Sequence, residues 1–387
     1  MSSQPTENPS VIEKAALRIF EKAPDRKAPV GALTRQQLVA MMKPIENRFI
    51  RLGVISGAMC GVVSSLGALL ANYLAPAGPS NTLAEQLTFH AIFLGIALSA
   101  TLIEILLLFQ MGVRSAAAIG KLAGVDVSSD LSEQASLKRA LVRAGLEIPC
   151  RTEPIFGIDP LQERRRVKYL MFTVAYKLKV SATSFVAKAL VRRIGARLTG
   201  RVLSRAMIEL VAVPVFALWN FIVCRLVMRQ VRVRALGPQL RDEIFSEVFP
   251  AGVASLPSNV QSACYHALRQ QVLCVGAFHH NMIMITQRFL DESSLNVEML
   301  GASTFLESLQ FLEPETQRWV LEWFCLLCAV DGGRSWRAKK KVLSALKESV
   351  SCSVEDKQLE RYRQAVFEGI SFETVAGVQF GEVTTQS

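Results

Sequence analysis

The feature that most constrains this chain of 387 residues is a stretch of 33 residues, 52–84, without any Asp, Glu, Lys or Arg. Its first part, residues 52–75, is predominantly apolar and is long enough to cross a hydrocarbon core about 30 Å thick. The turn-forming sequence PAGPSNT follows, and a second apolar run covers residues 87–113. Two such runs joined by a short polar turn predict a transmembrane helical hairpin over residues 51–113. The alternative is a hairpin buried inside a large soluble domain.

The distribution of basic residues predicts how this hairpin is oriented. Four basic residues precede the first span and two follow the second: Arg35, Lys43, Arg48, Arg51, Arg114 and Lys121. The connecting turn is followed by Glu85 and contains no Lys or Arg. Because cytoplasmic flanks carry the excess of basic residues, both flanks are expected in the cytoplasm and the turn outside.

Small residues recur every four positions on both predicted spans. They are Gly53, Gly57 and Gly61 on the first span and Ala91, Gly95 and Ser99 on the second. Small residues allow helices to approach closely in lipid, where no hydrophobic driving force brings them together. The two stripes are therefore expected to pack the hairpin together. The alternative is that the Gly53 stripe also drives self-association.

One acidic residue, Glu104, interrupts the second span. A charged carboxylate is costly inside a bilayer, so such a residue needs a partner or stays protonated. In one interpretation Glu104 handles protons or ions. In the other, which is favoured because no second acid forms a relay, it is a packing residue hydrogen-bonded to Ser56 or to another hydroxyl of the neighbouring span.

The basic excess of the chain lies in one segment, residues 164–238. This segment has sixteen Lys and Arg residues and the single acid Glu209, a net charge of +15, while the whole chain carries +11. Four arginines stand four residues apart and line one helical face: Arg193, Arg197, Arg201 and Arg205. Such a basic amphipathic helix is typical of a segment that lies on anionic lipid. A nucleic-acid partner is not expected, because no base-reading motif or stacking aromatics accompany the stripe.

A shorter apolar run, residues 210–224, lies within this basic segment. Its fifteen residues would extend about 22 Å as a helix, which is less than a full span. The run contains Pro214 and Asn220 and has basic flanks on both sides. We therefore expect a half-buried or re-entrant helix beside the hairpin. The alternative is a third span, which would move the C-terminal half to the outside.

The remaining sequence predicts helices, so the expected fold class is all-α. We expect a cytosolic helical region over residues 1–50, a cytosolic connector over 114–163, a soluble helical bundle over 239–370 and a flexible tail over 371–387. The expected helices of the bundle are 240–248, 258–288, 304–312, 313–330, 335–350 and 353–369. Gly332 and Gly333 provide a helix end.

The end of the bundle resembles a known module. It reads VLEWFCLLCAVDGG from residue 320, WRAKKKVLSALKE from residue 336 and SVEDKQLERYRQAVFEG from residue 353. An apolar helix that ends in Ala-Val-Asp-Gly and is followed by two further helices resembles the TerB-like (tellurite-resistance-type) helical domain. The whole layout resembles uncharacterised bacterial membrane proteins, which implies the bacterial cytoplasmic (inner) membrane.

The TerB-like resemblance also implies a link to membrane-associated stress complexes and acidic residues that bind metal. Asp331 matches the first acidic position, which makes it the one metal candidate. Where further acids usually follow, this chain has basic residues: Arg337, Lys339, Lys340 and Lys341. We therefore expect no bound metal and no cofactor.

Cysteines and histidines offer two weaker metal candidates. Cys325 and Cys328 form a C-x-x-C without a second pair at zinc spacing, and their apolar surroundings favour buried side chains. His279 and His280 follow Cys264, His266 and Cys274, and a metal cluster from these five is the less favoured interpretation. Nucleotide-binding and serine-hydrolase motifs are absent from the sequence.

Together these features predict a non-enzymatic membrane-anchored scaffold or adaptor. Its bundle would recruit a protein partner or a second copy of the chain, and its arginine stripe would contact anionic lipid head groups. No small-molecule substrate is indicated. The alternative is a small transport or pore-forming subunit that uses the hairpin and Glu104. An enzyme with an unfamiliar site is a third hypothesis, which no motif supports.

Overall fold

The computed structural model describes residues 10–23, 33–74, 82–125, 132–161, 204–297, 304–349 and 357–376. These residues form α-helices, one short 3-10 helix and connecting loops, so the fold is all-α as predicted. The pairing of extended backbone within the described ranges is limited to two isolated bridges, Arg151 with Phe278 and Ile155 with Ile158.

The chain divides into two compact units. Unit 1 contains residues Met1–Lys43, Ala116–Arg166 and Arg229–Ser387, and unit 2 contains Pro44–Ser115 and Val167–Met228. This differs from the expected linear series of domains. The connector over 114–163 packs into the same unit as the bundle, because its side chains and backbone bond to distant segments; for example, the Tyr265 hydroxyl donates to the Phe156 carbonyl at 2.8 Å.

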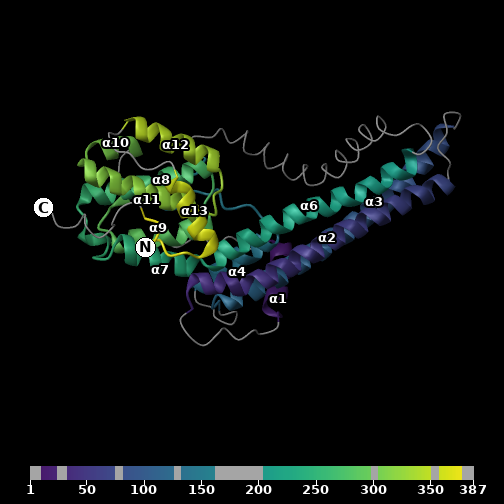
Figure 1. Ribbon diagram of the computed structural model, residues 1–387, viewed down its shortest axis with the longest axis horizontal. Helices are drawn as coiled ribbons and strands as arrows, with labels where there is room; N and C mark the ends of the chain where they lie inside the picture. The colour runs from purple at the N-terminus through teal and green to yellow at the C-terminus, as the bar shows by residue number, and fades with distance from the viewer. Residues whose placement is uncertain are drawn as a thin grey trace. The chain divides into compact units, whose positions relative to one another are not determined.

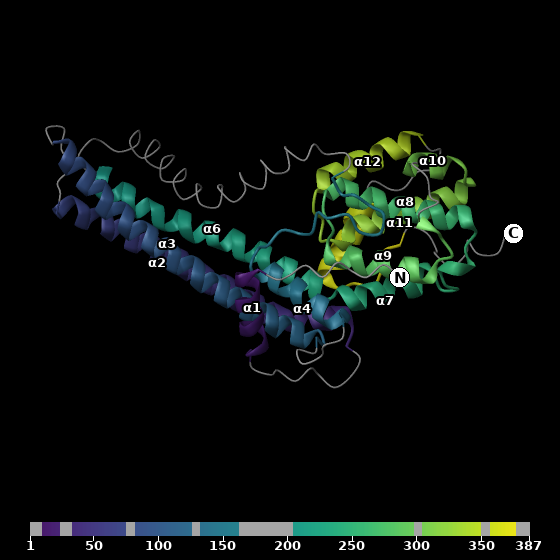
Figure 2. The ribbon, with the colours of Figure 1, turned by 180° about the vertical axis from the view of Figure 1, so that it is seen from behind.

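The described residues of unit 2 belong to three long helices, and each of these also contributes residues to unit 1. They are α2 (Arg35–Leu74), α3 (Leu83–Leu122) and α6 (Ser204–Ala235). They lie side by side in Figures 1 and 2. All three are long and apolar enough to cross a membrane by length and composition. The hairpin prediction is therefore matched by α2 and α3. The run 210–224 is not a short separate element, because it lies inside the continuous helix α6.

Close approaches within unit 2 define the directions of its helices. As α2 proceeds from Gly53 to Gly61, its neighbours on α6 run backwards from Cys224 to Val213. Its neighbours on α3 also run backwards, from Leu108 beside Gly53 to Ile96 beside Gly67. Both α3 and α6 are thus antiparallel to α2 and parallel to each other.

The outer faces of these helices are apolar. Large aliphatic side chains are exposed on each of the three, among them Ile55 (58%), Leu98 (67%) and Leu218 (60%). Soluble proteins rarely expose contiguous apolar surface of this kind. A lipid environment explains it, because such side chains then face hydrocarbon instead of water.

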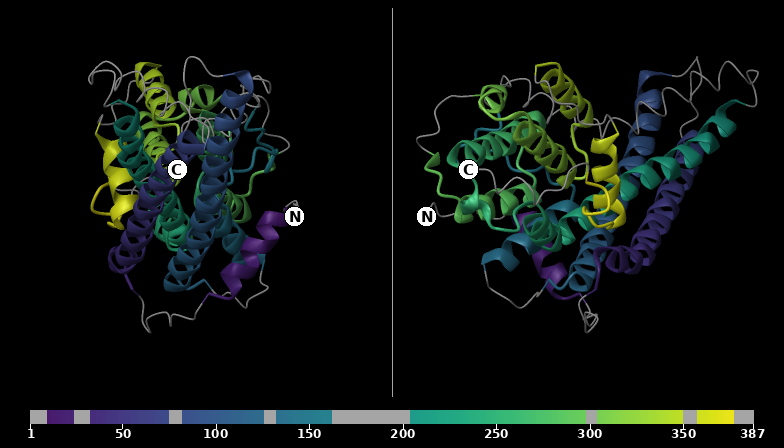
Figure 3. Two further views of the ribbon diagram at one scale, coloured as in Figure 1. Left: turned by 90° about the vertical axis from the view of Figure 1, so that its right-hand side faces the viewer. Right: turned by 60° about the vertical axis from the view of Figure 1, so that its left-hand side comes forward.

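Unit 1 contains the remaining helices, which Figure 3 shows from two further directions. They are α1 (Val11–Glu21), α4 (Ser132–Gly145), α7 (Gly237–Val248), α8 (Ser258–Val275), α9 (His280–Glu292), α10 (Phe305–Gln310), α11 (Pro314–Val330), α12 (Trp336–Ser349) and α13 (Gln358–Glu368), with a 3-10 turn at Val253–Ser255. α1 packs against α4, and α11 packs against α8 and α13.

The core of unit 1 is built around α11. Every residue of α11 from Trp319 to Val330 is buried, which explains why its sequence is apolar on all sides. Phe249 contacts the rings of both Trp319 and Trp323, at centroid distances of 5.8 and 5.2 Å. Cys325 and Cys328 lie inside this helix with 0% and 1% exposure and behave as small apolar residues, as expected.

Most helix ends in unit 1 follow the sequence signals, with two corrections. The expected helix 258–288 is two helices, because Gly276 adopts φ +71° and ends α8 in the left-handed conformation. The tail does not begin at residue 371, because Phe372 is buried (1% exposed) and its backbone N–H donates to Glu243 Oε1 at 3.0 Å. The predicted glycine helix end is confirmed, since Gly332 and Gly333 have φ of +74° and +77°.

Candidate functional site

A polar cluster lies among the apolar helices of unit 2. The Asn220 side-chain amide on α6 donates to Glu104 Oε1 on α3 at 2.6 Å. The same Nδ2 group donates to the backbone carbonyl of Gly53 on α2 at 2.9 Å. Glu104 is 9% exposed and Asn220 is 6% exposed. One amide thus connects all three helices at a single level.

The partner of Glu104 was not predicted correctly. The expected partner was Ser56 or another hydroxyl of the neighbouring span, and the structure supplies the Asn220 amide from the third helix instead. The signal was present in the sequence, because Asn220 is a polar residue inside an apolar run. Polar side chains in membrane helices commonly bond to one another across helices. An amide does not titrate, so Asn220 positions the carboxylate and offers no proton-relay group.

The glycine stripe of α2 also contacts α6 more closely than α3. A Cβ atom on Gly53 would overlap Cys224 Sγ, one on Gly57 would lie 2.7 Å from the backbone oxygen of Phe216, and one on Gly61 2.8 Å from Val213 Cα. At Gly57 and Gly61 the close atoms are backbone atoms of α6, so a larger residue there requires the helices to separate. The stripe packs the third helix onto the hairpin, whereas the expected partner was the second span.

The small residues of the second span lie on an exposed face of α3. Ala91 and Ser99 are exposed, and a Cβ atom on Gly95 would have no atom within 4 Å. This stripe therefore does not pack the hairpin together, contrary to the expectation. In α2 and α3 the close approach occurs further along, where a Cβ on Gly67 would lie 2.6 Å from the Ile96 side chain.

Asp331, the metal candidate of the sequence, is fully buried in an ion pair within unit 1. Its Oδ2 accepts from Lys339 Nζ at 2.6 Å and from Gln271 Nε2 at 3.1 Å. Its Oδ1 accepts from the backbone N–H groups of Gly333 and Arg334 at 2.9 and 3.1 Å. Both side chains of the ion pair have 0% exposure. Asp331 thereby holds the turn between α11 and α12, and the lysine ammonium supplies the cation next to it.

The cysteine and histidine candidates do not form a metal site within the described ranges, where no three His, Cys, Asp or Glu side chains come together. His279 instead caps α9, since its Nδ1 accepts from the Asn281 N–H at 3.3 Å. Burial, followed by the charges of Arg234 and Arg334, holds the pKa of His279 well below its usual value. Burial is also the main cause that lowers the pKa of His280, to about 3.

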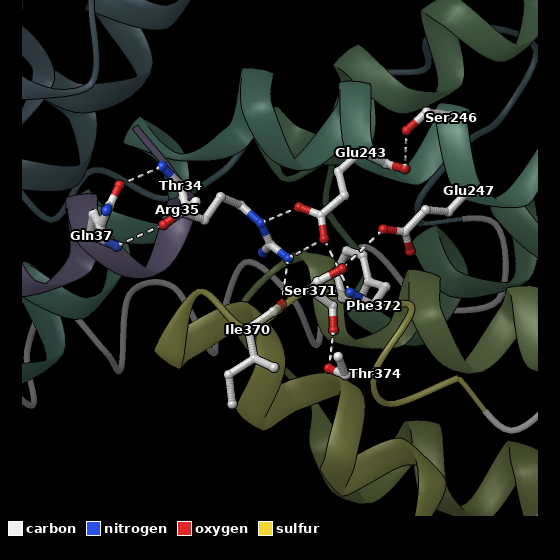
Figure 4. A network of polar contacts seen from close by, with 10 residues as sticks. All are labelled: Thr34, Arg35, Gln37, Glu243, Ser246, Glu247, Ile370, Ser371, Phe372 and Thr374. Carbon is white, nitrogen blue, oxygen red and sulfur yellow. Dashed lines mark hydrogen bonds and ion pairs between the residues drawn. The ribbon is translucent and has the colours of Figure 1, made fainter. Parts of the chain in front are cut away.

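A surface pocket of about 660 Å³ opens in unit 1 between segments that are distant in sequence. It is lined by the start of α2, the end of α3, α7 and the loop after α13. Arg35 is one of its lining residues, is 6% exposed, and binds both carboxylate oxygens of Glu243, at 2.5 and 2.8 Å (Figure 4). Arg35 also donates to the Ile370 carbonyl at 2.6 Å. A bidentate guanidinium–carboxylate pair of this kind is among the stronger charged contacts in proteins.

A second carboxylate, Glu247, stands in the same pocket one helical turn beyond Glu243 (Figure 4). Its Oε1 accepts from the Ser371 hydroxyl at 3.1 Å, while its Oε2 is buried without a hydrogen-bond donor. Burial and then the charge of Glu243 raise the pKa of Glu247. The pocket therefore holds an acidic group that is short of donors.

The predicted lipid-binding stripe, Arg193, Arg197, Arg201 and Arg205, lies outside the residues whose side chains the structure describes. Its contact with lipid stays a prediction. Comparison of the whole chain with protein-family models, with curated proteins and with solved structures gave no match. The TerB-like resemblance likewise stays a prediction.

Proposed function

We propose that this protein is a membrane-anchored scaffold or adaptor. Unit 2 would anchor it in the bacterial cytoplasmic membrane, and unit 1 would bind a protein partner or a second copy of the chain in the cytoplasm. The observation that carries the proposal is the exposed apolar surface of α2, α3 and α6. The same three helices supply residues to unit 1, where the buried core and the acidic pocket lie. The pocket suits a basic side chain of the partner, because Asp242, Glu243 and Glu247 all contribute to its lining.

Transport is the second candidate function, and the geometry around Glu104 favours it less. A transported ion or proton needs access to the carboxylate, whereas Glu104 is buried and bonded to Asn220. Asn220 is in turn bonded to the backbone of Gly53. These contacts suit a group that fixes three helices together. They account for an acidic residue in an apolar span without a transport role.

The two functions make opposite predictions. A photoreactive amino acid at Gln36, an exposed residue of the pocket rim, is expected to give a discrete cross-linked product in cells. Glu247→Lys should remove that product, because it places a positive charge where the pocket is acidic. The control Glu348→Lys, on the exposed side of α12, should retain it.

The transport arm of this test uses proteoliposomes. The protein is expected to pass protons and K⁺ no faster than protein-free vesicles, with or without Glu104→Gln, since glutamine keeps an oxygen that accepts from Asn220. Glu104→Leu should leave flux unchanged and lower stability by about 0.6–1.7 kcal/mol. A flux that Glu104→Gln abolishes would contradict the scaffold and support transport.

We further propose a topology in which α6 crosses the membrane. Because α3 and α6 are both antiparallel to α2, the start of α2 and the ends of α3 and α6 lie at the same end of unit 2. Arg48, Arg114 and Arg225 mark that end, which the positive-inside rule places in the cytoplasm. A third span in this direction keeps the C-terminal half inside, whereas the sequence prediction had such a span move it outside.

The topology has a consequence that labelling can test. In this topology the start of α6 lies at the outer end of unit 2, since α3 and α6 run in the same direction. Ser80→Cys and Ser204→Cys are therefore expected to react with a membrane-impermeant maleimide added to intact cells. Pro238→Cys should react only after the membrane is opened. The unsubstituted protein supplies the baseline for the native cysteines.

The labelling of Ser204→Cys is the decisive measurement. The basic residues just before Ser204 would lie on the outer side of the membrane, a placement that the positive-inside rule disfavours. Protection of Ser204→Cys in intact cells would contradict the crossing of α6 and place the Arg193 stripe at the inner leaflet. Labelling of Pro238→Cys in intact cells would contradict the cytoplasmic placement of unit 1.

A further inference from the structure

Positive charge gathers at the start of α9 in unit 1. The helix begins at His280 without an acidic residue in its first turn, so no carboxylate of its own offsets the partial positive charge of its N-terminus. Arg234 lies at the end of α6, and Arg334 lies in the turn after α11. After burial, the charges of these two arginines are the largest causes that lower the pKa of His279, the N-cap residue of α9. Two guanidinium groups from distant segments are thus close to one helix N-terminus.

These two guanidinium groups converge on one point. Arg334 Nη1 donates to Cys150 Sγ at 2.6 Å, and Arg234 Nη2 donates to the same sulfur at 3.5 Å. A cysteine sulfur is a weak hydrogen-bond acceptor, so it does not take the place of an anion. Cys150 and Arg334 are both partly exposed. The point of convergence therefore lies at the surface of unit 1, where a solute can reach it.

Carboxylates do not balance the two arginines. Among the residues that the structure describes, no ion pair joins Arg234 or Arg334 to an acidic side chain. Asp331 belongs to the same turn as Arg334, and it is already paired with Lys339 at 2.6 Å. Arg234 is only 5% exposed; its Nη1 donates to the Ala140 carbonyl, and its Nε is buried without an acceptor. A buried guanidinium without an anionic partner is costly.

The imidazole of His279 adds a second buried donor without an acceptor. Its Nδ1 atom accepts from the Asn281 N–H at 3.3 Å, so the neutral ring carries its proton on Nε2. Nε2 is buried without a hydrogen-bond partner, and His279 is 1% exposed. Buried polar groups in proteins normally have a partner. The unpaired donors of His279 and Arg234 therefore point to an acceptor that this structure does not supply from its own side chains.

We propose that Arg234, Arg334 and the N-terminus of α9 form a binding site for a phosphate-class oxyanion. Guanidinium groups and helix N-termini are the two elements with which proteins commonly bind such anions. A phosphate group presents several anionic oxygens, so it can accept from both guanidinium groups at once. Binding replaces the weak contacts of the two arginines to the Cys150 sulfur. The site is separate from the acidic pocket at Arg35, and it does not depend on the function proposed above.

The alternative is that buried water satisfies these donors and that the arginines only hold neighbouring segments together. Water satisfies the imidazole, but it carries no charge and leaves Arg234 and Arg334 unbalanced. The two possibilities differ in a measurable way. An oxyanion site binds phosphate to saturation through these arginines, whereas a purely structural cluster does not.

Equilibrium dialysis of radiolabelled inorganic phosphate against the full-length protein in non-ionic detergent, at constant ionic strength in chloride, tests the site. We expect saturable binding to the unsubstituted protein. Arg334→Gln should weaken this binding about tenfold or more, which is the loss of one hydrogen bond to a charged group. The matched control Arg337→Gln removes an exposed arginine of α12 and should leave the affinity unchanged. The absence of saturable binding, or equal affinities of the two variants, would overturn the assignment.

A second variant tests the same site without removing an arginine. Cys150→Asp places a carboxylate where the two guanidinium groups converge. It should raise the midpoint of thermal unfolding and abolish phosphate binding, because the added carboxylate then balances the arginines. Cys150→Ser adds no charge and should bind phosphate as the unsubstituted protein does. Phosphate binding that is equal in Cys150→Asp and Cys150→Ser would contradict the site.

Competition identifies the class and source of the ligand. Acetate, a carboxylate at the same ionic strength, should not displace the labelled phosphate, and displacement as effective as that by unlabelled phosphate would contradict a phosphate-class site. Glycerol phosphate represents a lipid head group in soluble form. If it displaces the label at lower concentration than inorganic phosphate does, the site binds a head group. The reverse order supports free phosphate as the ligand.

Discussion

Replacing Asp331 by alanine is expected to destabilise unit 1 by about 3–5 kcal/mol, the cost typical of removing one partner from a buried ion pair. The Lys339 ammonium is fully buried and would retain only the Cys328 carbonyl, at 2.7 Å, as an acceptor. The N–H groups of Gly333 and Arg334 would lose their acceptor at the same time. One substitution thus leaves a buried charge and several donors unsatisfied.

Urea unfolding followed by tryptophan fluorescence measures this loss. Three of the four tryptophans, Trp319, Trp323 and Trp336, belong to unit 1 and report on it. The double variant Asp331→Ala with Lys339→Met should recover a large part of the loss, because it removes the stranded charge. The control Asp291→Ala, at an exposed carboxylate, should stay within about 0.5 kcal/mol. A cost below about 1 kcal/mol for Asp331→Ala would contradict the structural role of this residue.

Replacing Gly57 by leucine is expected to destabilise the packing of α6 on α2 by about 1–3 kcal/mol, the usual cost of overpacking. The first added carbon would meet the Phe216 carbonyl at 2.7 Å, and a backbone atom cannot move aside as a flexible side chain can. The same carbon would lie 2.7 Å from the Asn220 amide nitrogen. The substitution therefore also disturbs the hydrogen bond to Glu104.

The matched control is Gly95→Leu on α3, where an added carbon meets no atom within 4 Å. Thermal unfolding in detergent, followed by loss of the monodisperse peak on size-exclusion chromatography, compares the two variants. At about 2–4 °C per kcal/mol, Gly57→Leu should lower the midpoint by several degrees and Gly95→Leu by none. Equal effects of the two substitutions would contradict the contact between the glycine stripe and α6.

The sequence alone was enough to predict the class of the fold and most helices. The charge-free stretch required a hairpin, because backbone groups in lipid must bond within helices. The end of α11 followed from a local signal, the glycines Gly332 and Gly333. The burial of Cys325 and Cys328 followed from apolar neighbours on all sides of one helix.

The partners of the functional candidates could not be predicted in the same way. Small residues on a helix face indicate that another helix approaches closely, but they do not indicate which helix it is. From the sequence, the glycine stripe that contains Gly57 could equally pack on α3. In the structure it packs on α6. Glu104 needed a polar partner on energetic grounds, and its identity depended on the position of Asn220, 116 residues away.

The sequence did not reveal the helix end at Gly276. It was sufficient for the apolar spans, the all-α class, the excess of positive charge and the helix end at Gly332 and Gly333. These properties arise from the local chain and from the solvent that each side chain requires. Which distant segments meet depends on the packed fold, which joins Asn220 to Glu104, Arg35 to Glu243 and Gln271 to Asp331. Such contacts depend on the packing of whole helices, since the free energy of a buried charge depends on the partner that the fold places beside it.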